Sequence, residues 1–208
     1  MNTLPHSGFA PPVATLIVPG YLGSGDGHWQ RIWADEDPDA LLVEQADFDR
    51  PARTAWLAAL DAAIAANPGA VLVAHSLGCI LIAHYARLRP QAAIAGALLV
   101  APADVEAVLG DYPQFASFAP VPRLPLPFPA TLVASRNDPF MDFSRARRFA
   151  SAWGARLVDL GEAGHVNVAS GHGVFPEARQ LANALRTPTS ASGAERRLSA
   201  AGAASVLG

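Results

Sequence analysis

"VLVAHSLGC", from Val71 to Cys79, joins two apolar runs through a short polar interruption. The first run is continuous and apolar, which is typical of a strand buried on both faces of a parallel sheet. The second run, "LGCILIAHYARLRP", predicts a helix that Pro90 ends. A buried strand that passes directly into a helix is the repeating unit of an α/β protein, so this stretch sets the expected fold class.

The same alternation continues on both sides of this stretch. Further strands are predicted within five segments: 13–20, 40–48, 94–102, 130–135 and 155–162. Helices are predicted through Trp29 and Trp33 and within 54–69, 142–154 and 176–186. We therefore expect a six-stranded, mainly parallel sheet with helices on both faces and right-handed crossovers.

Ser76 stands where the third predicted strand meets its helix. In a nucleophile elbow, small residues two positions before and two after a serine let this turn pack between strand and helix. The hydroxyl then projects above the sheet, beside a helix N-terminus that favours negative charge. Ala74 and Gly78 take the two small positions, both of which are usually glycine. A serine that only caps the helix is the alternative, but its place at the third of six strands favours a nucleophile.

The composition narrows the possible chemistry. The 208 residues, 51% of them hydrophobic and 16% charged, suit one domain with a large core. A net charge of −3 offers no basic surface to nucleic acid or to a membrane. All 15 positive residues are arginine, which excludes lysine Schiff bases and the lysine of a P-loop. Cys79 is the only cysteine, so a cysteine-based zinc site is excluded. We expect no cofactor and no metal.

A serine nucleophile needs a base, and the base needs an orienting acid. In α/β-hydrolases the chain order is serine, acid, histidine, with the last two on loops after later strands. Asp138, in "SRNDPF", follows the strand at 130–135, and His165, in "GEAGHVN", follows the strand at 155–162. All three residues would lie at the carboxyl edge of the sheet, where such folds bind ligands. We predict Ser76 as nucleophile, His165 as base and Asp138 as acid.

Other residues could take these roles less well. Asp104 follows the strand at 94–102 and is a weaker acid candidate, whereas Asp142 is expected to cap a helix. His172 could replace His165 but stands farther from a strand end. His75 is expected only to pack, because the elbow directs its side chain away from the Ser76 hydroxyl. His84 is expected to pack or to lie on the surface, and His6 precedes the domain.

Acyl transfer also requires donors for an oxyanion. The N–H of the residue after the nucleophile, Leu77, supplies one, and the loop after the first strand supplies the other. That loop is "PGYLGSGDGHW", and we predict the N–H of Tyr21 as the second donor, with Leu22 as the alternative. At its end, His28 and Trp29 either line the pocket or only cap and pack the next helix.

The segment from Asp104 to Pro129 is too long and too rich in proline for an ordinary connection. It carries Tyr112, Phe115, Phe118 and Phe128. We expect it to roof a modest apolar pocket that suits short acyl groups.

The expected domain organisation is simple. Residues 1–12 form an N-terminal extension, 13–186 the domain, and 187–208 a low-complexity, flexible tail. No secretory signal or apolar run of membrane-spanning length is evident, so a cytoplasmic protein is expected. The sequence leaves the oligomeric state open.

Four stretches together resemble the small single-domain α/β-hydrolases related to retinoblastoma-binding protein nine: "LIVPGYLGSGDGHWQRIW", "VLVAHSLGC", "SRNDPF" and "EAGHVN". The resemblance covers Val13 to about Arg186. It implies a serine hydrolase of small carboxylic esters or amides, with Ser76, Asp138 and His165 as its triad. It also implies a sheet without the two leading antiparallel strands of larger α/β-hydrolases.

Two other functions compete with hydrolysis. A catalytically silent scaffold could use the same fold for protein contacts, since fold does not fix function. A nucleotide-binding module could use the glycine-rich loop "PGYLGSGDG". Its G-x-x-G-x-G-x-G spacing departs from G-x-G-x-x-G, however, and Glu44 only weakly offers the acidic residue expected on the second strand.

Overall fold

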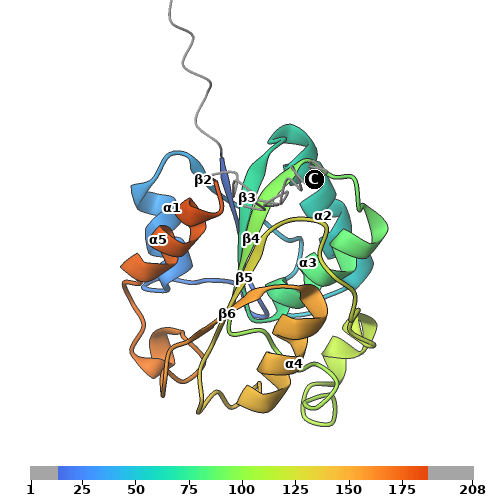
Figure 1. Cartoon of the computed structure of the whole chain (residues 1–208), viewed down its shortest axis with the longest axis vertical. Helices are drawn as coiled ribbons and strands as arrows, with labels where there is room; N and C mark the ends of the chain where they lie inside the picture. Colours follow the sequence, from blue (N-terminus) through green and yellow to red (C-terminus); the bar gives the residue numbers. More distant parts are fainter. Residues whose placement is uncertain (1–13, 187–208) are drawn as a thin grey trace, which may run out of the picture.

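The computed structural model describes residues 14–186, and within them six parallel strands form one sheet (Figure 1). The strand order is β2-β1-β3-β4-β5-β6, and every neighbouring pair is parallel. The strands are β1 (Thr15–Val18), β2 (Ala40–Leu42), β3 (Ala70–His75), β4 (Ile94–Val100), β5 (Ala130–Ala134) and β6 (Arg156–Asp159). The chain reverses its direction of winding between β1 and β3, and open α/β sheets bind ligands at the carboxyl edge beside such a point.

Helices cover both faces of the sheet. In Figure 1, α1 (Trp29–Glu36) and α5 (Pro176–Ala184) lie on one face. The other face carries α2 (Arg53–Ala66), α3 (Leu77–Leu88) and α4 (Phe143–Trp153). Two short 3₁₀ helices, η1 (Pro113–Phe118) and η2 (Val168–Ser170), lie in connections. The α/β-hydrolase fold with a reduced six-stranded sheet, predicted from the alternation of strands and helices and from the resemblance, is confirmed.

Strand β3 lies between two hydrophobic layers, one on each face of the sheet. Its residues are all buried, and they alternate between the faces. Leu72 and Ala74 pack in the layer with α2 and α3, whereas Val71 and Val73 pack in the layer with α1 and α5. Because both faces of the strand are covered, its sequence is apolar at consecutive positions rather than at alternate ones.

Local signals set the ends of α4. The carboxylate of Asp142 accepts hydrogen bonds from the N–H groups of Ser144 and Arg145, at 2.8 and 3.3 Å. These bonds satisfy donors that have no partner within the helix. Gly154 ends the helix in the left-handed conformation, at φ +66°. Asp142 is therefore a helix cap, as its position after β5 predicted.

The segment 104–129 covers the site only in part. Tyr112, just before η1, and Phe115, within it, line the cavity beside Ser76. The rest packs elsewhere, since Pro122 C=O accepts from Nε1 of Trp153 at 2.8 Å and Leu126 N–H donates to Trp153 C=O at 3.0 Å. The expected roof is thus limited to its first half, because the proline-rich second half lies against α4.

The expected extension at 1–12 and the tail at 187–208 fall outside the described residues, so both stay predictions. Across residues 14–186, no helix is both long and apolar enough to cross a membrane.

Candidate active site

Ser76 occupies a sharp turn between β3 and α3. Its backbone has φ +53° and ψ −120°, outside the conformations that a non-glycine residue usually adopts. The residue is partly exposed although both of its neighbours are buried. A strained serine at the junction of a strand and a helix is the geometry of a nucleophile elbow.

Two glycines allow the elbow to pack against the end of β1. A Cβ atom on Gly78 would lie 2.4 Å from the carbonyl oxygen of Val18 and 2.7 Å from that of Pro19. A Cβ atom on Gly20 would lie 2.9 Å from Cβ of Ser76. Both positions therefore require glycine for close approach, and this approach brings the loop after β1 beside the nucleophile.

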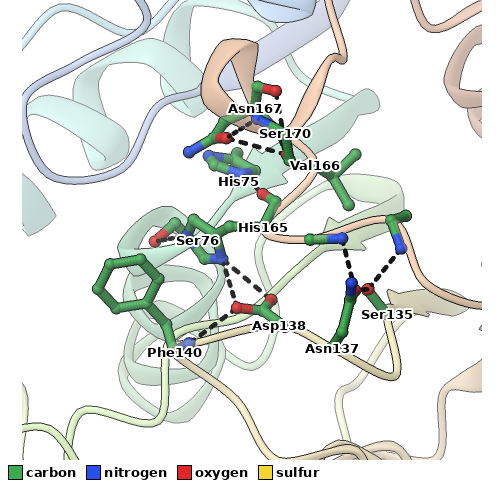
Figure 2. A network of polar contacts seen from close by, with 12 residues as sticks. His75, Ser76, Ser135, Asn137, Asp138, Phe140, His165, Val166, Asn167 and Ser170 are labelled. Carbon is green, nitrogen blue, oxygen red and sulfur yellow. Dashed lines mark hydrogen bonds and ion pairs between the residues drawn. The ribbon is translucent and has the colours of Figure 1, made fainter.

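The three predicted side chains form a continuous hydrogen-bonded chain (Figure 2). Nε2 of His165 lies 2.9 Å from Oγ of Ser76. Nδ1 of the same ring lies 2.9 Å from each carboxylate oxygen of Asp138. The side chain of Asp138 is only 2% exposed, and its Oδ1 also accepts from the N–H of Phe140 at 2.8 Å. With Nδ1–H donating to the carboxylate, Nε2 is free to accept the serine proton.

The loop that carries His165 is tied to the loop that carries Asp138. Oδ1 of Asn137 accepts from the N–H of Gly164 at 2.7 Å, and Oγ of Ser135 accepts from the N–H of Ala163 at 2.9 Å (Figure 2). The Ser135 hydroxyl in turn donates to Asn137 at 2.8 Å. These bonds join side chains after β5 to the backbone before His165, so they fix the position of the base relative to the acid.

His75 contributes to the site, although the sequence predicted only packing for it. The ring is buried, and Nε2–H donates to the carbonyl of His165 at 2.8 Å. Nε1 of Trp29 donates to the next carbonyl, that of Val166, at 2.9 Å. The last residue of β3 and the first residue of α1 therefore hold the backbone of the histidine loop. No signal in the sequence identified these bonds, because they depend on which carbonyls that loop turns inward.

The two predicted oxyanion donors belong to the loop after β1 and to the start of α3, which are in contact. Leu77 is the first residue of α3, so its N–H has no acceptor within the helix. The N–H of Tyr21 has no hydrogen-bond partner among residues 14–186, whereas that of Leu22 donates to Phe48 C=O at 3.1 Å. An ideal Cβ on Gly20 would lie 3.1 Å from the nitrogen of Leu77, which places the two loops in contact. The geometry therefore favours Tyr21 over Leu22.

A cavity of about 420 Å³ opens beside Ser76 and His165. Four aromatic rings line part of it and touch in sequence: Tyr21, Phe115, Tyr112 and Phe140. Phe140 in turn lies against His165, with ring centroids 4.5 Å apart. A second row of rings leads from His165 through His75 to His28, with centroid separations of 4.8 and 4.9 Å.

The other aspartate and histidine candidates for the acid and the base have different partners. Asp104 is buried and accepts from Arg145 at 2.6 and 2.8 Å, so its charge is already paired. His84 is buried and binds Phe118 C=O, and His172 lies against Phe175. His6 lies outside the described residues. Within residues 14–186, no group of three or more histidine, cysteine, aspartate or glutamate side chains is arranged to hold a metal ion.

Burial lowers the pKa values of His28 and His75. Burial, together with the nearby charge of His165, lowers the pKa of His28 from 6.5 to about 4. Burial, with the charges of His165 and His28, lowers the pKa of His75 as well. Both rings are therefore neutral at neutral pH, and acid should favour the unfolded chain, in which they take up protons more readily.

We accordingly expect the free energy of unfolding to fall as the pH drops from 7 towards 4. A folded-state pKa below the unfolded value contributes stability above the unfolded pKa, and that stability is lost as pH falls towards the folded one. For His28 alone the loss between pH 7 and pH 5 is about 2 kcal/mol. Urea unfolding at both pH values measures it. His28→Asn should show a smaller difference, and an equal difference would contradict this assignment.

The chain matches known proteins both in sequence and in structure. A family model described as serine hydrolase matches residues 15–184. The chain belongs to the serine hydrolase family. Among solved structures, this serine hydrolase is similar to a protein from Pectobacterium atrosepticum described as a YdeN-like hydrolase. The two share 32% identity over 84% of this chain and 92% of that chain, with a TM-score of 0.74.

More distant structures share the fold of this serine hydrolase. The ydeN gene product of B. subtilis is 20% identical over 83% of this chain and 97% of its own, with a TM-score of 0.63. The esterase RhEst1 from Rhodococcus is 15% identical over 83% and 91%, with a TM-score of 0.57. A comparison with curated proteins gives no match. The relation to retinoblastoma-binding protein nine stays a prediction that fits this family.

Proposed function

We propose that this serine hydrolase cleaves a small carboxylic ester or amide through an acyl-enzyme intermediate. The observation that carries the proposal is the chain of hydrogen bonds from Ser76 through His165 to Asp138, at the edge of an open cavity. A hydroxyl bound to an imidazole, which is itself oriented by a buried carboxylate, is an activated nucleophile.

In the proposed mechanism, Oγ of Ser76 attacks the substrate carbonyl carbon as its proton passes to Nε2 of His165. Asp138 holds the ring and stabilises the imidazolium that forms. The N–H groups of Tyr21 and Leu77 bind the negative oxygen of the tetrahedral intermediate. The imidazolium then protonates the leaving alcohol or amine, and water, activated by the same ring, releases the acid from the serine.

The two competing functions make different use of the site. A catalytically silent scaffold would not require a hydrogen-bonded serine beside two free N–H groups. A nucleotide-binding module would direct the N-terminus of α1 at a phosphate, but the ring of His28 caps this end by accepting from the N–H of Gln30 at 3.2 Å. Hydrolysis is the function that the geometry supports best.

A fluorophosphonate probe tests the proposal directly. Covalent labelling of one serine at neutral pH, located by mass spectrometry at Ser76, is expected in the native chain and absent in Ser76→Ala. Ser144→Ala, which alters an exposed serine on α4, is the matched control and should label normally. Absence of labelling in the native chain would favour the scaffold, and tight nucleotide binding would favour the nucleotide module.

Hydrolysis of 4-nitrophenyl acetate and 4-nitroacetanilide then separates ester from amide preference.

A further inference from the structure

His28 lines the cavity and keeps one ring nitrogen without a partner. Its Nδ1 accepts from the N–H of Gln30, so the ring proton lies on Nε2. The residue is 7% exposed, and across residues 14–186 no acceptor binds this N–H group. Because His28 lines the cavity and this N–H group has no partner in the described part of the protein, the group is available to a bound substrate.

The charge state of His28 limits what this donor can bind. Because the pKa of His28 is about 4, the ring is neutral at neutral pH. It therefore offers one N–H group and no positive charge. Such a group suits a neutral oxygen, as in an ether, hydroxyl or carbonyl, because a carboxylate or a phosphate would lose its hydration here without gaining a charged partner.

Asn167 is a second polar residue that lines the same cavity. Its Oδ1 accepts from both the N–H and the hydroxyl of Ser170, at 3.1 and 3.0 Å. The amide nitrogen consequently points away from Ser170 (Figure 2). Asn167 and His28 both line the cavity, whereas the row from Tyr21 to Phe140 offers aromatic rings. The cavity lining thus combines polar side chains with a row of aromatic ones.

We propose that Nε2–H of His28 binds a neutral hydrogen-bond acceptor in the substrate, while the aromatic row holds an apolar part. This inference rests on the proposed function and narrows its substrate class. The substrate is an ester or amide that carries an ether, hydroxyl or carbonyl oxygen in addition to its scissile carbonyl. His28 then determines specificity through direct contact with that oxygen.

Two variants separate the contact from the structural role of His28. His28→Asn keeps an oxygen that can cap α1 but is too short to present a donor at the position of Nε2. His28→Gln places an amide nitrogen near that position and caps the helix less well. His28→Asn should therefore preserve the helix cap better, whereas His28→Gln should preserve the substrate contact better.

Two pairs of esters report the contact, each differing by one oxygen in place of a methylene group. 4-Nitrophenyl methoxyacetate and butyrate place the oxygen in the acyl half. 2-Methoxyethyl acetate and butyl acetate place it in the alcohol half. The measured quantity is the kcat/KM of the ether divided by that of its hydrocarbon partner, and comparison with the native chain cancels intrinsic reactivity.

In at least one pair, His28→Asn should lower this ratio by about tenfold, the value of one hydrogen bond, and His28→Gln should retain most of it. A ratio unchanged by His28→Asn in both pairs would overturn the inference. An equal loss in both variants would also overturn it, because it would follow a general disturbance of α1. These failures leave Ser76 labelled and the esters hydrolysed, so they differ from failure of the proposed function, in which neither occurs.

Discussion

Asp138→Asn is expected to lower kcat for a 4-nitrophenyl ester by about 10⁴ without unfolding the chain. The amide can donate to Nδ1 of His165, whose proton then moves to Nε2, on the side that faces Oγ of Ser76. A protonated Nε2 cannot accept the serine proton, so the nucleophile stays inactive. Steady-state rates and a circular dichroism spectrum of the variant check both parts of this expectation.

The matched control is Asp142→Asn on the same loop. Asp142 caps α4, and asparagine caps a helix equally well, so both activity and stability should remain close to those of the native chain. Full activity in Asp138→Asn would contradict the proposed triad and would make Asp104 the candidate for the acid.

Gly78→Ala is expected to destabilise the fold by about 3 kcal/mol or more, a large share of the stability of a typical domain. The added methyl group would lie 2.4 and 2.7 Å from two carbonyl oxygens at the end of β1. Both contacts are with backbone, so relief requires movement of β1 or of α3. Such movement also separates Tyr21 from Leu77, so kcat should fall together with the free energy of unfolding.

Gly110→Ala is the control for this effect. A Cβ atom there meets nothing within 4 Å, and the residue is exposed. Urea unfolding should place this variant within about 0.5 kcal/mol of the native chain. Gly78→Ala with native stability and native kcat would show that the elbow does not require close approach.

Much of the fold follows from the sequence, because hydrophobic continuity is a local signal. The run from Ala70 to Ala74 is apolar because helices cover both faces of β3, and the same reason makes β1, β4 and β5 recognisable. Ser76, Asp138 and His165 could be selected for a related reason. Each follows a strand of a parallel sheet, and the carboxyl ends of such strands share one edge.

The remaining features depend on loop conformation, which no local pattern records. The preference for Tyr21 over Leu22 rests on the carbonyl of Phe48, which belongs to a distant loop. The role of His75 rests on a carbonyl of the histidine loop, where Val166 adopts φ +50°. The proline-rich part of 104–129 was expected over the site, but its contacts with Trp153 are invisible in composition.

The loop that bears His165 is anchored from three directions: by Trp29 after β1, by His75 at the end of β3, and by Ser135 and Asn137 after β5. Any drift of this loop during evolution would require matched changes in all three anchors. The rings of Tyr112 and Phe115 stack on each other and meet Tyr21 and Phe140 through edge contacts. Relatives with new substrates should therefore arise mainly by exchange of these rings, while the chemical machinery is inherited unchanged.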